Sequence, residues 1–508
     1  MKSRICPAVI ALLLMCTSCA SVQVSEPAPY GVLPTEQQVE WQKMEFNMFV
    51  HFGPNTFSGD EWGSGQEKAE LFNPTAMDCR QWASIAKAAG MKGIIITGKH
   101  HDGFCLWPNP YSRHTVAQSS WKDGKGDVLK ELSDACREYD IEFGIYISPW
   151  DRHDPHYGTD EYNDVYVKTL EHALGNYGPV FEQWFDGACG EGPNGKKQVY
   201  DWPLFNSTVY RMQPDAVIFS DYGPGCRWVG NERGSAGRTC WSTMEINDEL
   251  AGHPERIRIL NEGTKGGNTW VPAESDVSIR PGWFWKEHEN DDVKSLRHLL
   301  NIYYESVGRN SLLLLNVPPD TRGLIQEADS ARLMELRAAL DEIFSVNLAA
   351  GAQVEAENVR GGSSRFCEDN MLNDEYDSYW ASDDDVTTVS FTVTLSEQKT
   401  FNLVQLQDEN GNEINFEHLM TVEYEGSYYV LLEATEDMDD CQQGEAIILK
   451  IIRDDESGED VYATIEDEAE FEEGFEKCMA AMEEEDSADS LISRFKLFGA
   501  DPKLGVHS

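Results

Sequence analysis

The chain has 508 residues, too many for one ordinary domain, and 41% of them are hydrophobic, which is enough for a sizeable core. Its formal net charge is −48, and half of that charge lies between Phe401 and Ser508, where 30 Asp and Glu stand against 6 Lys and Arg. An acidic surface repels phosphate backbones, so the composition argues against nucleic acid as a partner.

The first residues have the features of an export signal. Two basic residues precede an apolar run, 8–15, which is too short to cross a bilayer, and small residues follow it. Segment 1–19 resembles a bacterial lipoprotein signal peptide, which implies a location in the periplasm or cell envelope and a lipid anchor at Cys19 as the one membrane attachment. The residue three before it is Cys16, where that pattern usually has Leu, and the alternative is plain cleavage near Ala20.

Cysteines give no sign of a metal or disulfide framework. Nine of them lie beyond Cys19, with irregular spacing and no CxxC pair. We therefore expect mostly core thiols, and neither a metal nor another cofactor.

From about residue 40, apolar strands alternate with amphipathic helices. The strands are predicted at 46–53, 93–101, 141–150, 179–187, 215–223 and 311–319, and the helices at 79–90, 127–139, 160–178, 202–213 and 291–310. Repeated βα units with nearly continuous apolar strands indicate a parallel sheet with both faces covered. The chain is therefore predicted to be an α/β protein with a (β/α)8-like barrel over 30–345, and a doubly wound sheet is disfavoured because no Gly-rich phosphate loop follows the first strand.

Unusual polar residues stand at the ends of these strands. They include His51, the pair His100–His101, Tyr146 and Asp186, where the apolar run "VFEQWF" stops at an acid followed by glycine. In a barrel, the carboxyl ends of all strands open onto one face, so these residues are predicted to meet around one mouth.

Such a mouth suits a sugar, because aromatic faces stack on C–H patches while His and carboxylates bond the hydroxyls. Hydrolysing a glycoside requires two carboxyl groups, one of which must start the reaction protonated. Asp186 is one candidate. Glu232 is the second, and we expect it to be buried against Trp228; the rival second acids are Glu191, Glu245 and Glu274.

Other interpretations stay open for these residues. Asp186 could cap a helix, and Glu232 could be a surface ion-pair partner. His100 and His101 could bind a metal, or one could be a hydrogen-bonded core histidine, and Trp283 could be core packing.

Eight motifs in order over about 40–325 resemble the α-L-fucosidases of glycoside hydrolase family 29. They are "MFVHFG", "TGKHHDGFCLWP", "GKGDVLKEL", "FGIYISPWDRH", "NYGPVFEQWFDGACGEGPNGKKQVYDW", "RWVGNERG", "WVPAESDVSIRPGWFW" and "YYESVGRNSLLLLNVPPD". The sixth and seventh resemble the subgroup acting on α-1,3/1,4-linked fucose. The resemblance implies a retaining exo-hydrolase of fucosylated glycans that forms a covalent fucosyl-enzyme and needs no cofactor.

The resemblance also implies roles for single residues. Asp186 matches the nucleophile and Glu232 the acid/base. The positions that match fucose-binding residues are His51, Glu61, Trp62, His100, His101, Tyr146 and Trp184, with Trp283 or Phe284 against the fucose methyl group. The alternatives are another exo-glycosidase or transfucosidase, and a non-hydrolytic fucose-binding protein, which would have no use for both acids.

Beyond the barrel the pattern changes. Segment 348–406 resembles the start of a discoidin-like β-sandwich but has about half the necessary length. Segment 407–486 resembles the acidic YrzB-like family, and 487–508 is a tail. We therefore expect a partial β-sandwich followed by a small acidic α+β domain, and we interpret the junction as a chimera, natural or from a misassembled gene.

Overall fold

The computed structural model describes residues 24–478, apart from 248–249, 251–252, 348, 374, 376, 396–402, 408–412, 425–426, 435–445, 454–459, 466, 468–469, 472 and 476. The predicted signal peptide 1–19, with Cys19, and the tail 487–508 lie outside the described residues. Within the described part of the chain, no helix is long and apolar enough to cross a membrane.

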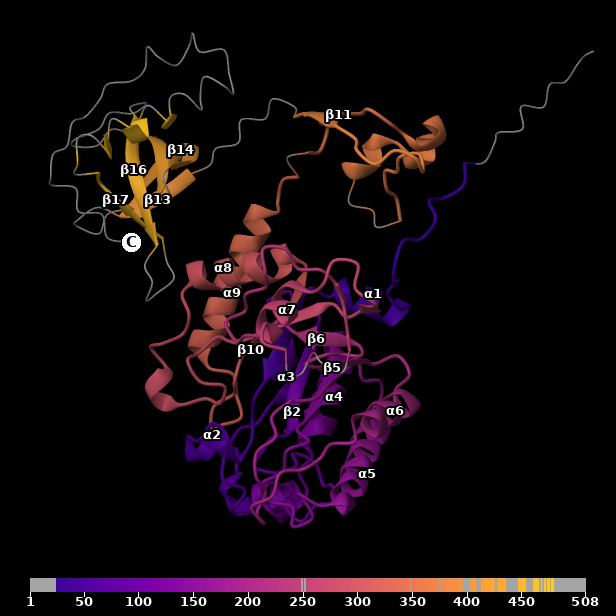
Figure 1. The fold of residues 1–508 in the computed structure, drawn as a ribbon. Helices are drawn as coiled ribbons and strands as arrows, with labels where there is room; N and C mark the ends of the chain where they lie inside the picture. The colour runs from indigo at the N-terminus through magenta and orange to yellow at the C-terminus, as the bar shows by residue number, and fades with distance from the viewer. Residues whose placement is uncertain are drawn as a thin grey trace, which may run out of the picture. The chain divides into compact units, whose positions relative to one another are not determined.

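Eight parallel strands close into a barrel in the order β1-β10-β9-β6-β5-β4-β3-β2 (Figure 1). The strands are β1 (Phe46–Val50), β2 (Gly93–Lys99), β3 (Glu142–Ile147), β4 (Glu182–Trp184), β5 (Val217–Ser220), β6 (Cys226–Trp228), β9 (Ala273–Ser278) and β10 (Ser311–Asn316). The predicted (β/α)8-like barrel is confirmed. Six strands match the predicted ones, whereas β6 and β9 were not predicted.

Helices cover the outside of the barrel, and α5 packs against α6 (Figure 1). The helices are α1 (Glu36–Gln42), α2 (Pro54–Ser58), α3 (Cys79–Ala88), α4 (Val128–Tyr139), α5 (Asp160–Asn176), α6 (Trp202–Met212), α7 (Arg256–Glu262), α8 (Leu296–Ser306) and α9 (Glu327–Ile343). Helix α4 shows why they form where they do. The Asp127 side chain accepts from the Lys130 N–H at its start, and Asp140 adopts the left-handed conformation at its end.

Short 3-10 helices join these elements at Ala69–Leu71, Val116–Gln118, Trp121–Gly124, Glu287–Glu289, Val307–Arg309, Arg360–Gly362, Ser364–Phe366 and Glu368–Met371. Between β6 and β9 the chain adds α7 and a small hairpin of β7 (Thr243–Met244) with β8 (Thr269–Trp270).

The core has two layers. One lies between the helices and the barrel wall, where Trp82 and Leu132 are fully buried. The other fills the barrel interior with Phe49, Tyr146 and Trp184. The interior layer is unusual because aromatic rings lie directly beneath the mouth, so the packing of the core and the floor of the site are the same structure.

The chain divides into two compact units, 1–30 with 346–399 and 31–345 with 400–508. In the first, β11 (Gln353–Ala356) pairs antiparallel with β12 (Phe391–Thr394). Arg360 donates to the Asp384 carboxylate at 2.6 Å and to the Ser25 carbonyl at 2.7 Å. The discoidin-like character of this segment stays a prediction.

A separate sheet of five antiparallel strands follows in the order β13 to β17. Its strands are β13 (Leu403–Gln407), β14 (Glu413–Tyr424), β15 (Ser427–Ala434), β16 (Ala446–Arg453) and β17 (Asp460–Ala463). The predicted boundary between 406 and 407 falls inside β13. That strand pairs with Glu413–Glu417 of β14 and buries Leu406 against Phe416, so Leu403–Leu406 belong to this sheet.

Candidate active site

Aromatic and imidazole rings from four neighbouring strands meet at the barrel mouth. His51 follows β1, His100 follows β2, and Tyr146 and Trp184 stand near the ends of β3 and β4. The ring centroids of His51 and His100 are 5.7 Å apart, those of His100 and Tyr146 5.7 Å, and those of Tyr146 and Trp184 5.2 Å. The structure therefore brings together these predicted binding residues.

Asp186 lies at the edge of this ring cluster. Its Oδ2 accepts a 3.0 Å hydrogen bond from the Tyr146 hydroxyl, and its Oδ1 accepts one of 2.7 Å from the Ala188 N–H. His101 Nε2 lies 3.7 Å from Oδ2. The Asp186 side chain keeps 26% of its surface exposed, so the carboxylate is held by donors and still open to a ligand.

The three histidines of the mouth are neutral at neutral pH. Burial lowers the pKa of His51 to about 3 and that of His101 to about 4. Burial, reinforced by repulsion from His101, lowers the pKa of His100 well below its usual value. Neutral imidazoles can both donate and accept hydrogen bonds, which is what a set of sugar hydroxyls requires.

Two of these histidines are oriented by partners that sequence reasoning missed. His51 Nδ1 lies 2.8 Å from Asn316 Oδ1, and His101 Nδ1 lies 2.8 Å from Ser148 Oγ. By contrast, His100 Nδ1 is buried without a hydrogen-bond partner among the described residues.

Glu232 is connected to the residues of the mouth by a hydrogen bond from Trp283. The Trp283 indole Nε1 donates to Glu232 Oε2 at 3.2 Å, and the Trp283 backbone N–H donates to Glu61 Oε2 at 3.0 Å. The Trp283 ring also lies 5.0 Å from the ring of His51. Glu232 itself is exposed, so the expected burial against Trp228 was wrong; the loop places it against Trp283 instead.

The remaining predicted binding residues line the rim. Glu61 forms an ion pair with Lys286, and Trp62 is 60% exposed, with its ring 6.3 Å from that of His101. Phe284 is fully buried, with its ring 5.1 Å from that of His100. Trp62 is therefore the exposed ring of the group, and Phe284 is the buried one.

A third carboxyl, Asp276 near the end of β9, was missed. It is buried, and its Oδ1 accepts a 2.9 Å hydrogen bond from the Trp228 indole. Burial raises its pKa well above the usual value, and the charges of Glu232 and then Asp186 raise it further.

The rival second acids lie in other surroundings. Glu245 is exposed and accepts from Asn268 at 3.0 Å. Glu191 is exposed in a turn that pairs with Lys197. Glu274 is fully buried in the barrel interior, where the Trp184 indole donates to it at 2.7 Å. Among the three exposed acids, Glu232 is the one whose carboxylate accepts a hydrogen bond from an aromatic ring, that of Trp283.

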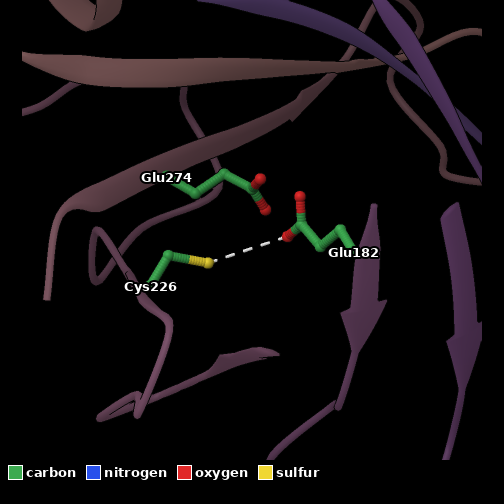
Figure 2. A group of neighbouring side chains, drawn as sticks. All are labelled: Glu182, Cys226 and Glu274. Carbon is green, nitrogen blue, oxygen red and sulfur yellow. Dashed lines mark hydrogen bonds between the residues drawn. The ribbon is translucent and has the colours of Figure 1, made fainter. Parts of the chain in front are cut away.

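One described cluster has donor atoms close enough to hold a metal ion. A carboxylate oxygen of Glu182, the Cys226 sulfur and a carboxylate oxygen of Glu274 all lie within 4.8 Å of one another, and all three residues are buried (Figure 2). The group lies in the barrel interior on β4, β6 and β9, and not among the residues predicted to contact a sugar.

Comparisons with known proteins place these features in a family. The family model described as "Alpha-L-fucosidase" matches residues 25–341. An Arabidopsis thaliana protein named alpha-L-fucosidase 1 is 44% identical over 406 residues, which is 79% of each chain. Residues 409–483 match a family described as "Protein of unknown function (DUF1292)". The YrzB-like resemblance of that segment stays a prediction.

Solved structures agree with the barrel assignment. A putative alpha-L-fucosidase from Bacteroides thetaiotaomicron is 37% identical with a TM-score of 0.69, covering 86% of this chain and 94% of its own. A Ruminococcus gnavus fucosidase of glycoside hydrolase family 29, solved in complex with fucose, is 31% identical with a TM-score of 0.68 and covers 84% of this chain and 89% of its own.

Proposed function

The chain belongs to the α-L-fucosidase family of glycoside hydrolases, and we propose that it removes terminal α-1,3/1,4-linked L-fucose with retention of configuration. The observation that carries this proposal is the setting of Asp186, a partly exposed carboxylate held by the Tyr146 hydroxyl and the Ala188 N–H at the barrel mouth. A carboxylate held in this way is oriented by its donors, as a nucleophile must be.

In the first step Glu232 donates its proton to the glycosidic oxygen while an oxygen of Asp186 forms a bond to C1 of the fucose. The bond from C1 to the leaving group breaks, and the product is a covalent fucosyl-enzyme. Because Glu232 is exposed in the free protein, the bound glycan itself must exclude water from this acid.

In the second step the Glu232 carboxylate takes a proton from water, and the water oxygen bonds to C1 as the bond to Asp186 breaks. Two displacements restore the original anomeric configuration. This scheme requires the two carboxyl groups to be about 5 to 5.5 Å apart when substrate is bound.

The fucose would be held by neutral rings and one carboxylate. The imidazoles of His51, His100 and His101 would form hydrogen bonds with its hydroxyl groups. Glu61 would accept from two hydroxyls and Trp62 would cover the sugar. The remaining contacts are apolar walls, supplied by Tyr146, Trp184, Trp283 and Phe284.

We place the enzyme in the periplasm or cell envelope, anchored by lipid at Cys19. This location rests on the sequence of 1–19 alone. It fits a hydrolase that takes fucose from oligosaccharides or glycoconjugates outside the cytoplasm.

The test is hydrolysis of branched Lewis-type trisaccharides beside an α-1,2-fucosylated trisaccharide, with NMR of the first anomer released. We expect faster release from the branched substrates and α-fucose as the first product. A first product of β-fucose would reject retention, and faster release from the α-1,2 substrate would reject the linkage preference. A protein that binds fucose without turnover would be the non-hydrolytic alternative.

A further inference from the structure

Two fully buried glutamates face each other inside the barrel. Glu182 at the start of β4 and Glu274 on β9 are both 0% exposed, and Figure 2 shows their carboxyl groups pointing toward one another, with Cys226 of β6 beside them. They lie below the mouth and do not take part in the two displacements. Buried carboxyl groups this close need a reason to persist.

Three of the four carboxyl oxygens have a hydrogen-bond donor. Glu182 Oε2 accepts from the Trp41 indole at 2.7 Å, and Glu182 Oε1 accepts from the Cys226 thiol at 3.7 Å. Glu274 Oε1 accepts from the Trp184 indole at 2.7 Å. Glu274 Oε2 is buried and has no partner among the described residues.

Two ionised carboxylates in this interior would repel each other without water to screen them. A proton on Glu274 Oε2 resolves both difficulties, because it removes one charge and turns the oxygen without a donor into a donor toward Glu182.

The titration of the pair agrees with this geometry. Burial raises the pKa of Glu182 to about 7. Burial, and then the charge of Glu182, raises the pKa of Glu274 well above its usual value. The indole N–H groups of Trp41 and Trp184 each donate to one oxygen of the pair, Glu182 Oε2 and Glu274 Oε1.

We propose that Glu182 and Glu274 share a single proton, carried on Glu274 Oε2, and that the pair positions Trp184 in the floor of the active site. Trp184 stacks on Phe219 with a centroid separation of 3.8 Å and on Tyr146 at 5.2 Å. Trp184 also stands two residues before Asp186 on the same strand end. The pair is thus connected to the nucleophile through the Trp184–Glu274 hydrogen bond, the stack of Trp184 on Tyr146 and the hydrogen bond from Tyr146 to Asp186.

The first experiment detects the shared proton by infrared spectroscopy of the full-length protein at neutral pH. In E274Q the amide donates to Glu182, and in E182Q the amide donates to Glu274, so neither variant needs the proton. We expect a protonated-carboxyl C=O band in the wild-type-minus-variant difference for both substitutions. If neither difference spectrum shows such a band, the proposal is overturned.

Elemental analysis of the same purified proteins tests the alternative that Glu182 and Glu274 bind a metal ion. About one equivalent of a divalent metal in the wild type that is lost in both E274Q and E182Q would overturn the shared proton and assign a metal site. Metal below stoichiometric amounts in all three proteins supports the proton.

The second experiment tests the positioning role by measuring kcat and KM on an aryl fucoside. It rests on the proposed roles of Trp184 and Asp186. E274Q keeps an acceptor for the Trp184 indole, so we expect kcat within about twofold of wild type. Glu274→Leu removes this acceptor, and we expect kcat to fall about tenfold with a smaller change in KM. Ultraviolet resonance Raman of the Trp184 indole should report loss of its hydrogen bond in Glu274→Leu alone.

Several outcomes remain decisive. If Glu274→Leu does not fold, infrared spectroscopy of the two amide variants still decides whether the pair shares a proton. If Glu274→Leu folds and keeps wild-type kcat, the positioning role is rejected. If D186A also keeps wild-type kcat, the proposed nucleophile fails, and the infrared result stands independently of it.

Discussion

The Tyr146 hydroxyl donates a 3.0 Å hydrogen bond to Asp186 Oδ2 at the mouth of the barrel. Burial, and then the negative charge of Asp186, raises the pKa of the Tyr146 phenol well above its usual value. The phenol therefore stays protonated throughout the range in which an enzyme is assayed, and it remains a donor. One buried ring thus both packs the barrel interior and sets the orientation of the nucleophile.

Removing that hydroxyl should slow the chemistry and spare the fold. In Tyr146→Phe the ring still stacks on Trp184, but Asp186 loses one of its donors, and we expect kcat on an aryl fucoside to fall about 10- to 100-fold. Tyr166→Phe is the matched control, because the Tyr166 hydroxyl is equally buried and donates to the Ile147 carbonyl at 2.6 Å. The control should lose about 1 kcal/mol of unfolding free energy and keep its kcat.

Deleting the nucleophile should abolish turnover but not binding. We expect Asp186→Ala to lower kcat on an aryl fucoside by about 10⁴-fold or more, as removal of a covalent nucleophile does. Fucose binding, measured by calorimetry, should persist because His51, His100 and His101 remain. Wild-type-like turnover in this variant would reject Asp186 as the nucleophile.

The architecture could be predicted because most barrel strands are continuous apolar runs. The stretch 93–97, "GIIIT", is buried on both faces and reads as a strand from composition alone. The convergence of His51, His100 and Tyr146 then follows from the rule that strand ends share one face of a barrel.

Two strands escaped prediction for a physical reason. Strand β6 is three residues long, and β9 is "AESDVS", whose buried Glu274 and Asp276 break the apolar pattern. Those acids are tolerated in the interior only because Trp184 and Trp228, from other strands, donate to them. Partners brought together by closure of the barrel leave no local signal, and this is also why Asp276 was missed.

The setting of Glu232 could not be predicted either. Its contact with the Trp283 indole joins a loop after β6 to a loop after β9, 51 positions apart in the chain. Sequence neighbours suggested Trp228 as the burying residue, but the Trp228 indole is directed to Asp276. The choice of Glu232 as the acid stays a prediction, whereas its surroundings had to come from the fold.

The role of Glu232 predicts a dependence on the leaving group. In Glu232→Ala an aryl fucoside with an acidic phenol should lose little in the first step, because that phenol departs without a proton. A fucosylated trisaccharide needs the proton, and its kcat/KM should fall about 10²- to 10⁴-fold. Added azide should restore turnover of the aryl substrate by displacing Asp186 from the fucosyl-enzyme, giving a fucosyl azide of retained configuration.

Glu245→Ala supplies the control for Glu232→Ala. Glu245 is exposed like Glu232 but accepts from Asn268, outside the ring cluster. We expect its kinetics on both substrates to match wild type. An equal loss on the two substrates in Glu232→Ala would show that it is not the acid/base.

Asp102 gives the protein a pH-dependent stability, and the sign can be worked out. Burial raises its pKa from 3.8 to about 7, so the folded state binds the proton more tightly than the unfolded state. The stabilisation that this proton gives the folded state is fully present below about pH 4 and is lost as the pH rises through 7. Asp102→Asn does not titrate and keeps an oxygen for the Phe104 N–H, which donates to Asp102 Oδ1 at 2.8 Å. Urea unfolding should therefore show a loss of stability from pH 5 to pH 8 that is about 2 kcal/mol smaller in the variant.

Asp164→Asn, which removes an exposed charge, should keep the wild-type difference, and an equal effect in both variants would show that burial of Asp102 is not the cause.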